Sequence, residues 1–265
     1  MLGFLLPIVA MSALAPNPKW TITFRDEFEG PSGIAPSTDH WIRNTGGGGY
    51  GNKELQSYTD GPSNAFLDGK GHLVIEARKE ATTGSDGIKC DYSSARLLTK
   101  GKFSQKYGRV EARIKLPKGQ GIWPAFWMLG DNIDIAGWPS CGEIDIIESV
   151  GPVVKTVFGT LHGPGYSGAD GIQGKLEVQK SLADDFHVYA VEWEPGEIRW
   201  YFDDKCYQTI TKDKVPGKGW PYDQPFFIIL NLAVGGYWPG NPDATTVFPQ
   251  RLVIDYVRVM KRAKS

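Results

Sequence analysis

Ten short runs rich in β-branched and aromatic residues recur along this 265-residue chain, with turn-forming residues between them. Runs of this kind predict β-strands, and they do not alternate with long amphipathic helical patterns. We therefore expect an all-β fold, an antiparallel β-sandwich or jelly roll, rather than a parallel α/β sheet. The 33 glycines and 18 prolines fit many short strands joined by tight turns. The predicted strands are Thr21–Phe28, Leu73–Ala77, Gly108–Leu116, Trp123–Leu129, Glu143–Ser149, Val157–His162, His187–Trp193, Ile198–Phe202, Pro225–Val234 and Leu252–Met260.

The length fits one large β-domain, and no linker divides the chain, so we expect residues 16–265 to form a single domain. Residues 1–15 are almost wholly apolar, too short to span a bilayer, and followed by Pro16-Asn-Pro18. This pattern predicts an export signal and a secreted protein. The match is imperfect because no Lys or Arg precedes the apolar stretch, so a disordered terminus or a frayed first strand is the alternative.

A formal net charge of -1 gives no reason to expect nucleic acid or an anionic membrane as a partner. A neutral substrate fits this balance better, and we expect a monomer. The three cysteines, Cys90, Cys141 and Cys206, allow at most one disulfide, and their spacing indicates neither a pairing nor a metal site.

An acidic cluster lies in the apolar run Glu143-Ile-Asp145-Ile-Ile-Glu148. Side chains alternate along a strand, so Glu143 and Asp145 share a face, while strict alternation would send Glu148 into the core. An unpaired carboxylate there costs several kcal/mol or stays protonated. One extra residue at Ile146–Ile147 removes the conflict, and we therefore predict a β-bulge that returns Glu148 to the face of the other two carboxylates.

Two carboxylates on a cleft floor with a third between them are what retaining glycoside hydrolysis requires: a nucleophile and a general acid/base whose pKa values are driven apart. A solvated acidic edge strand is one alternative, but the flanking segments are rich in apolar residues, glycine and tryptophan. A metal-binding trio is another, although hard cations usually take their ligands from loops rather than strands.

Aromatic residues alternate in the run from Gly121 to Leu129. The alternation places Trp123 and Trp127 on one face and Ile122, Phe126 and Met128 on the other, which suits the core. Indole rings on the first face would form a platform for pyranose rings, with Trp138 near the acidic strand as a third; packing in the core is the plainer alternative.

The last predicted strand carries Asp255 on the face that also holds Val253, Val257 and Val259. A carboxylate among valines needs a partner. A salt bridge is the default expectation, and a calcium ion with backbone carbonyl ligands is the other solution.

Several further segments accompany the pattern Glu-x-Asp-x-x-Glu formed by Glu143, Asp145 and Glu148. They are Glu54-Leu-Gln-Ser-Tyr-Thr59, Thr99-Lys-Gly-Lys-Phe103, Tyr107-Gly-Arg-Val-Glu-Ala-Arg113, Gly121-Ile-Trp-Pro-Ala-Phe-Trp127, Gly137-Trp-Pro139, Leu161-His-Gly-Pro-Gly-Tyr-Ser167, Asn231-Leu-Ala-Val-Gly-Gly236 and Asp255-Tyr-Val-Arg258. Across these segments, over about residues 20–260, the chain resembles glycoside hydrolase family 16, and within it the laminarinase-like endo-β-1,3-glucanases. The lichenase-like branch has one residue fewer before the second glutamate.

The resemblance implies a curved, concanavalin-like jelly roll with a substrate cleft on its concave face. It assigns Glu143 as the nucleophile, Glu148 as the acid and then base, and Asp145 as the group that tunes the pair. Carboxyl groups roughly 5 to 5.5 Å apart are expected for such a retaining reaction. The matching substrate-binding positions are Trp123, Trp127, Trp138, Asn44, Glu111, Arg113, Asn231 and, more weakly, Arg78 and His162.

A purely structural role is the alternative for His162. Because no second histidine lies nearby in the sequence, a zinc site is disfavoured. The resemblance further implies a structural Ca²⁺ on the convex side, held by Glu27, Gly71 and Asp255. The expected activity is hydrolysis of internal β-1,3 bonds in laminarin-type β-glucan, with mixed-linkage β-1,3-1,4 glucan as a further substrate. The alternatives are another polysaccharide such as agarose or carrageenan, transglycosylation, and a non-catalytic glucan-binding lectin.

Overall fold

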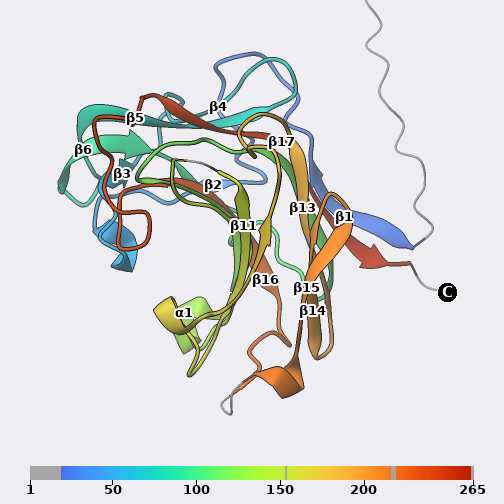
Figure 1. Cartoon of the computed structure of the whole chain (residues 1–265). Coiled ribbons are helices and arrows are strands. Elements are labelled where there is room, and N and C mark those ends of the chain that lie inside the picture. Colours follow the sequence, from blue (N-terminus) through green and yellow to red (C-terminus); the bar gives the residue numbers. More distant parts are fainter. Residues whose placement is uncertain (1–18, 153, 216–218, 264–265) are drawn as a thin grey trace, which may run out of the picture.

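Two β-sheets form the computed structural model, which describes residues 19–152, 154–215 and 219–263 (Figure 1). The seven-stranded sheet has the strand order β12-β11-β10-β9-β16-β7-β2. Its strands are β12 (Ile172–Glu177), β11 (Thr156–His162), β10 (Glu143–Glu148), β9 (Ile122–Gly130), β16 (Phe226–Val234), β7 (Arg96–Leu98) and β2 (Ile42–Arg43).

The ten-stranded sheet has the order β15-β14-β13-β8-β17-β5-β6-β3, with β1 beside β17 and β4 beside β5. Among the described strands, β3 and β6 pair in parallel and the other pairs are antiparallel. The strands are β15 (Lys205–Thr211), β14 (Glu197–Phe202), β13 (His187–Glu194), β8 (Gly108–Lys115), β17 (Gln250–Arg262), β5 (Leu73–Thr83), β6 (Lys89–Ser94), β3 (Gln56–Tyr58), β1 (Trp20–Asp26) and β4 (Ala65–Leu67).

Helical structure in the described residues is confined to single turns. They are α1 (Ile133–Ala136), η1 (Gly49–Gly51), η2 (Gly168–Asp170) and η3 (Lys212–Lys214). None of the described helices is long and apolar enough to cross a membrane. The predicted all-β sandwich is therefore confirmed, and each of the ten predicted strands has a counterpart in the structure.

The core lies between the two sheets, where one apolar cluster joins side chains of both. The smaller sheet contributes Phe126 and Ile144, for example, and the larger sheet contributes Val191 and Trp200. The first described strand, β1, pairs with the last, β17, so that both ends of the described chain lie together (Figure 1). The expected export signal, residues 1–15, lies outside the described residues.

Candidate active site

A β-bulge in β10 brings the three carboxylates to one face. Opposite β9, Asp145 pairs with Trp127 and Ile147 with Phe126, which leaves Ile146 as the extra residue. Ile144, Ile146 and Ile147 are all buried in the core cluster. The bulge confirms the sequence prediction, and its physical reason is the one given there: it keeps Glu148 out of the apolar core.

The bulge is supported from behind by Trp200 of β14. On the β11 side, Asp145 pairs with Thr160 and Glu148 with Phe158, so Gly159 alone faces the two bulged isoleucines. The Trp200 indole N–H donates a 2.8 Å hydrogen bond to the backbone carbonyl of Asp145. A Cβ at position 159 would stand 2.4 Å from Trp200 Cδ1, so only glycine leaves room for this ring.

Indole and imidazole groups surround the carboxylates. Trp138 Nε1 donates to Glu143 Oε2 at 2.8 Å, and Trp123 Nε1 donates to Glu148 Oε1 at 3.0 Å. His162 Nε2 lies 3.2 Å from Asp145 Oδ2 and 3.7 Å from Glu143 Oε1. The structure thus brings together the whole predicted trio, two of the predicted tryptophans and His162.

Burial raises the pKa of every carboxyl group in the trio. Desolvation, and then the charge of Asp145, raise the pKa of Glu143 to about 8, while His162, the Trp138 hydrogen bond and Arg96 act in the opposite direction. Desolvation likewise raises the pKa of Asp145. The pKa of Glu148 is raised well above its usual range by desolvation and then by Asp145 and Glu143. At neutral pH the cluster therefore holds at least one proton, as an acid catalyst requires.

Trp127 and Asn231 form the floor beside the trio. Trp127 Nε1 donates to Asn231 Oδ1 at 2.6 Å, and Asn231 Nδ2 donates to the Tyr58 hydroxyl at 3.1 Å. The Tyr58 hydroxyl in turn donates to Glu54 at 3.2 Å. This chain of hydrogen bonds fixes the orientation of Trp127. Of the predicted core residues of β9, Ile122, Phe126 and Met128 are buried as expected.

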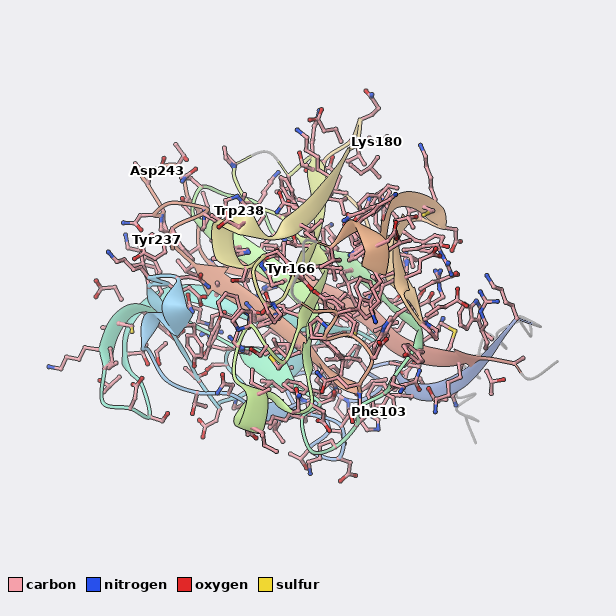
Figure 2. The ribbon with its side chains drawn as sticks, turned by 90° about the horizontal axis from the view of Figure 1, so that it is seen from below. Phe103, Tyr166, Lys180, Tyr237, Trp238 and Asp243 are labelled. Atoms are coloured by element: carbon pink, nitrogen blue, oxygen red, sulfur yellow. The ribbon has the colours of Figure 1, made fainter. Side chains whose placement is uncertain are left out.

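Sequence reasoning missed two residues of this face. The Arg96 guanidinium lies 4.9 Å from the centre of the Trp127 ring and 5.1 Å from that of Tyr50. Trp238, labelled in Figure 2, lies in the loop after β16. It packs edge-on against Trp123 with ring centres 5.6 Å apart. Its place in the run Gly-Gly-Tyr-Trp-Pro-Gly, an aromatic pair among turn residues, was the available signal.

Four predicted positions lie farther from the trio: Asn44, Glu111, Arg113 and Arg78. Asn44 follows β2 at the edge of the smaller sheet and hydrogen-bonds through its backbone to Arg96. Glu111 and Arg113 belong to β8 of the larger sheet, on the face opposite the buried Ala112 and Ile114. Their prediction as residues of the cleft is corrected: their strand turns them outward, away from β10.

Arg78 is corrected for the same reason. It stands on β5 of the larger sheet, and its guanidinium pairs with Glu76 at 2.7 Å. Glu76 also binds Arg251 of β17 at 2.6 Å, so Arg78 belongs to an ionic cluster on the outside of that sheet.

The three predicted calcium residues give a mixed result. A Cβ at Gly71 would lie 4.0 Å from the Glu27 carbonyl oxygen, so these two backbones do approach each other. Asp255, however, binds Arg113 at 2.6 Å, and the Glu27 carboxylate binds Arg258 at 2.8 and 2.7 Å. A salt bridge thus already neutralises Asp255.

The predicted face of Asp255 is also corrected, because a register shift interrupts the β17–β8 pairing at this residue. Val257 and Val259 are buried, whereas Val253 and Asp255 are partly exposed.

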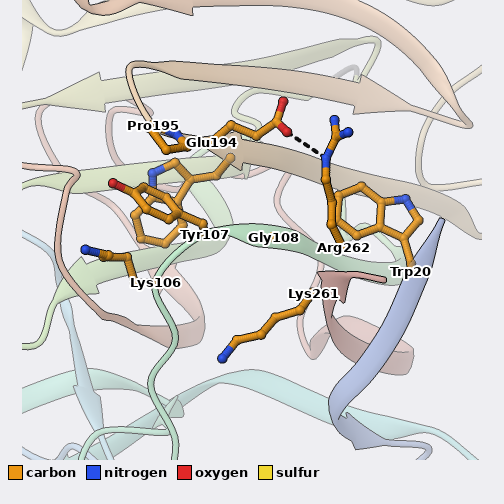
Figure 3. Close-up of a pocket in the computed structure, with 9 residues that line it drawn as sticks. Trp20, Lys106, Tyr107, Gly108, Glu194, Pro195, Lys261 and Arg262 are labelled. Atoms are coloured by element: carbon orange, nitrogen blue, oxygen red, sulfur yellow. Dashed lines mark ion pairs between the residues drawn. The ribbon is translucent and has the colours of Figure 1, made fainter. Parts of the chain in front are cut away.

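A separate hollow of about 230 Å³ lies at one end of the larger sheet (Figure 3). Trp20, Tyr107 and Pro195 line it, and an ion pair of 2.6 Å joins Arg262 to Glu194 at its rim. None of the predicted site residues lines this hollow, whereas the predicted carboxylates, two tryptophans and His162 meet on β10. The trio on β10 is therefore the candidate active site.

Comparison with known proteins agrees with this site. Residues 52–258 match the glycosyl hydrolases family 16. The chain is 45% identical over 257 residues to a beta-glucanase of Rhodothermus marinus, a match that covers 92% of this chain and 86% of that protein. The endo-beta-1,3-glucanase from Pyrococcus furiosus has a solved structure that is 48% identical, with a TM-score of 0.88, over 94% of this chain and 97% of that one. The laminarinase catalytic domain from Thermotoga maritima MSB8 is 48% identical, with a TM-score of 0.87, over 93% and 100%. In agreement with the motifs in its sequence, the chain belongs to the glycosyl hydrolases family 16.

Proposed function

We propose that this protein is a retaining endo-β-1,3-glucanase that cleaves internal bonds of laminarin-type glucans. The observation that carries the proposal is the bulge in β10, which places Glu143 and Glu148 on one face with Asp145 between them. Each glutamate accepts a hydrogen bond from a tryptophan indole, so both carboxyl groups are held in place before substrate arrives.

The surroundings of the two glutamates divide their roles. Both glutamates accept an indole hydrogen bond, lie near His162 and feel the charge of Asp145, but Arg96 favours ionised Glu143, and the charge of Glu143 in turn raises the pKa of Glu148. The favoured arrangement is therefore ionised Glu143 beside protonated Glu148. This is the starting state of a double displacement, in which one carboxylate attacks and one carboxylic acid protonates.

In the first step, a Glu143 oxygen bonds to the anomeric carbon while the glycosidic bond breaks. The leaving oxygen takes the proton of Glu148. In the second step, Glu148 removes a proton from water, the water oxygen bonds to the anomeric carbon, and the bond to Glu143 breaks. Inversion occurs twice, so the configuration is retained.

Indole faces support a glucan as the substrate. Trp123, Trp127 and Trp138 stand around the trio, and aromatic faces pack well on the apolar faces of pyranose rings. The similar proteins named above are a beta-glucanase, an endo-beta-1,3-glucanase and a laminarinase. Mixed-linkage β-1,3-1,4 glucan is the second candidate substrate, and agarose or another galactan the less favoured one.

The test is reducing-sugar release, with product sizes, from laminarin, barley mixed-linkage glucan and agarose, for the wild type beside Glu143→Gln. We expect short oligosaccharides from laminarin with the wild type and none with the variant. Full activity of Glu143→Gln would refute the assignment of the nucleophile. If the folded wild type cleaves none of the three polysaccharides, a different polysaccharide substrate or a lectin role would be favoured.

We propose three further properties. A structural Ca²⁺ would take the carbonyl oxygens of Glu27 and Gly71 together with Asp255, which would have to share its carboxylate with Arg113. The apolar residues 1–15 support export, and amino-terminal sequencing of protein recovered from a culture medium tests it. The oligomeric state, which we expect to be monomeric, can be read in the same preparation by light scattering.

A further inference from the structure

Three potential metal ligands converge at the nucleophile. Glu143 and Asp145 come from β10 and His162 from the end of β11, and one donor atom from each lies within 4.8 Å of the other two. The pairing of β10 with β11 sets Glu143 opposite His162. The group therefore has one histidine, and its other two ligands are carboxylates in place of the second histidine that the sequence lacks.

The spacing of these atoms suits a tetrahedral zinc ion. Zinc binds imidazole nitrogen and carboxylate oxygen at about 2.0–2.2 Å, so that two ligand atoms of one tetrahedron stand about 3.3–3.6 Å apart. His162 Nε2 lies 3.2 Å from Asp145 Oδ2 and 3.7 Å from Glu143 Oε1. Two edges of the ligand triangle are therefore within about 0.1 Å of the tetrahedral spacing, and the third, between Glu143 and Asp145, is at most 4.8 Å.

A buried polar atom without a partner points to the same position. Asp145 is only 2% exposed, and in the described part of the chain its Oδ2 atom has no hydrogen-bond partner despite its closeness to His162. Such an atom is costly unless something satisfies it, and a cation does so.

The shell around the three ligands would hold them in place. Trp138 binds the second oxygen of Glu143. Gly171 packs against the far edge of the His162 ring, where a Cβ would stand 2.7 Å from Nδ1.

We propose that Glu143, Asp145 and His162 form a Zn²⁺ site whose occupation blocks the nucleophile. One nitrogen and two carboxylate ligands suit Zn²⁺ better than Mg²⁺ or Ca²⁺, which prefer all-oxygen sites with more ligands. The fourth corner would take water. Coordination to zinc withdraws negative charge from the Glu143 carboxylate and lowers its nucleophilicity, so zinc acts as a reversible inhibitor. The inhibition rests on the proposed glucanase function, whereas the binding does not.

The binding test uses the full chain, freed of metal and titrated with ZnCl₂ in a calorimeter. We expect one Zn²⁺ per chain for the wild type, and for His162→Gln an affinity lower by about 100-fold. The matched control is His187→Gln, because His187 faces a single carboxylate, Asp203 at 2.7 Å, on the protein surface. The control should bind Zn²⁺ like the wild type, and MgCl₂ should give no binding at this site.

A melting curve without metal checks the folding of each variant, and Glu143→Gln replaces His162→Gln if the latter does not fold. Wild-type affinity in His162→Gln, or lost affinity in His187→Gln, would overturn the site. The activity arm measures laminarin hydrolysis with ZnCl₂ and then with excess chelator, which should restore the rate. Zinc binding with no activity on any glucan would leave the metal site standing and refute only the proposed function.

Discussion

Replacing Trp200 by phenylalanine tests whether the bulge in β10 depends on support from the opposite sheet. The change removes the indole N–H that donates to the Asp145 carbonyl at 2.8 Å and leaves a six-membered ring in the core. Trp193→Phe is the matched control. Trp193 is equally buried, but its Nε1 has no hydrogen-bond partner among the described residues.

Both variants lose the same atoms, so the difference between them isolates the hydrogen bond. Leaving the Asp145 carbonyl without this donor costs about 1–3 kcal/mol. For a domain of this size each kcal/mol lowers the melting temperature by roughly 2–4 °C. We therefore expect Trp200→Phe to melt roughly 2–12 °C below Trp193→Phe.

The activity assay separates a positioning role from a merely structural one. If the bond fixes the bulge, its loss lets Glu148 shift relative to Glu143, and misplacement by about 1 Å costs about 100-fold in rate. We expect kcat on laminarin to fall in Trp200→Phe with little change in KM, and to stay near wild type in Trp193→Phe. Equal melting temperatures and equal kcat values for the two variants would refute the reasoning.

Three other predictions follow from the site. Glu143→Gln should be more stable than the wild type at pH 8. Folding raises the pKa of the Glu143 carboxyl from 4.5 to about 8, so the ionised carboxyl destabilises the folded state more and more as the pH rises between these values. Melting curves at pH 4.5 and pH 8 should show a gain in stability only at the higher pH. Trp123→Phe removes the hydrogen-bond donor that favours ionised Glu148 and so raises the pKa of that carboxyl; the alkaline limb of the kcat/KM profile should therefore move to higher pH. In the control Trp127→Phe the lost N–H binds Asn231 instead, so the alkaline limb should stay unchanged. If calcium binds at Glu27, chelation should lower the melting temperature and added CaCl₂ restore it without changing kcat; a melting temperature indifferent to both would count against the calcium site.

Local patterns in the sequence were sufficient for the strands and for the chemistry on β10. The spacing Glu-x-Asp-x-x-Glu implied the bulge because a strand has a period of two and an apolar core rejects an unpaired carboxylate. The same period separated Trp123 and Trp127 from the core residues of β9. Both inferences concern neighbours along one strand, so they needed no knowledge of the partner strands.

The smaller elements escaped prediction because their sequences carry little of that period. Strands β2, β4 and β7 span two or three residues each, and in the edge strand β12 the alternation of Ile172 and Leu176 with polar residues is weakened by Gly174 at its centre. They exist because longer neighbours pair with them.

Tertiary structure alone decided which sheet each strand joined and therefore which residues surround the trio. Glu111, Arg113 and Arg78 carry suitable side chains but stand on the larger sheet, facing away from β10. His162 and Trp200 reach the trio from positions that the local pattern of β10 does not encode. The sequence by itself determined that carboxylates would meet on one strand face, because that follows from the geometry of a single strand. The partners that tune and support them come from distant segments, and only the pairing of strands and the packing of the two sheets bring those segments together.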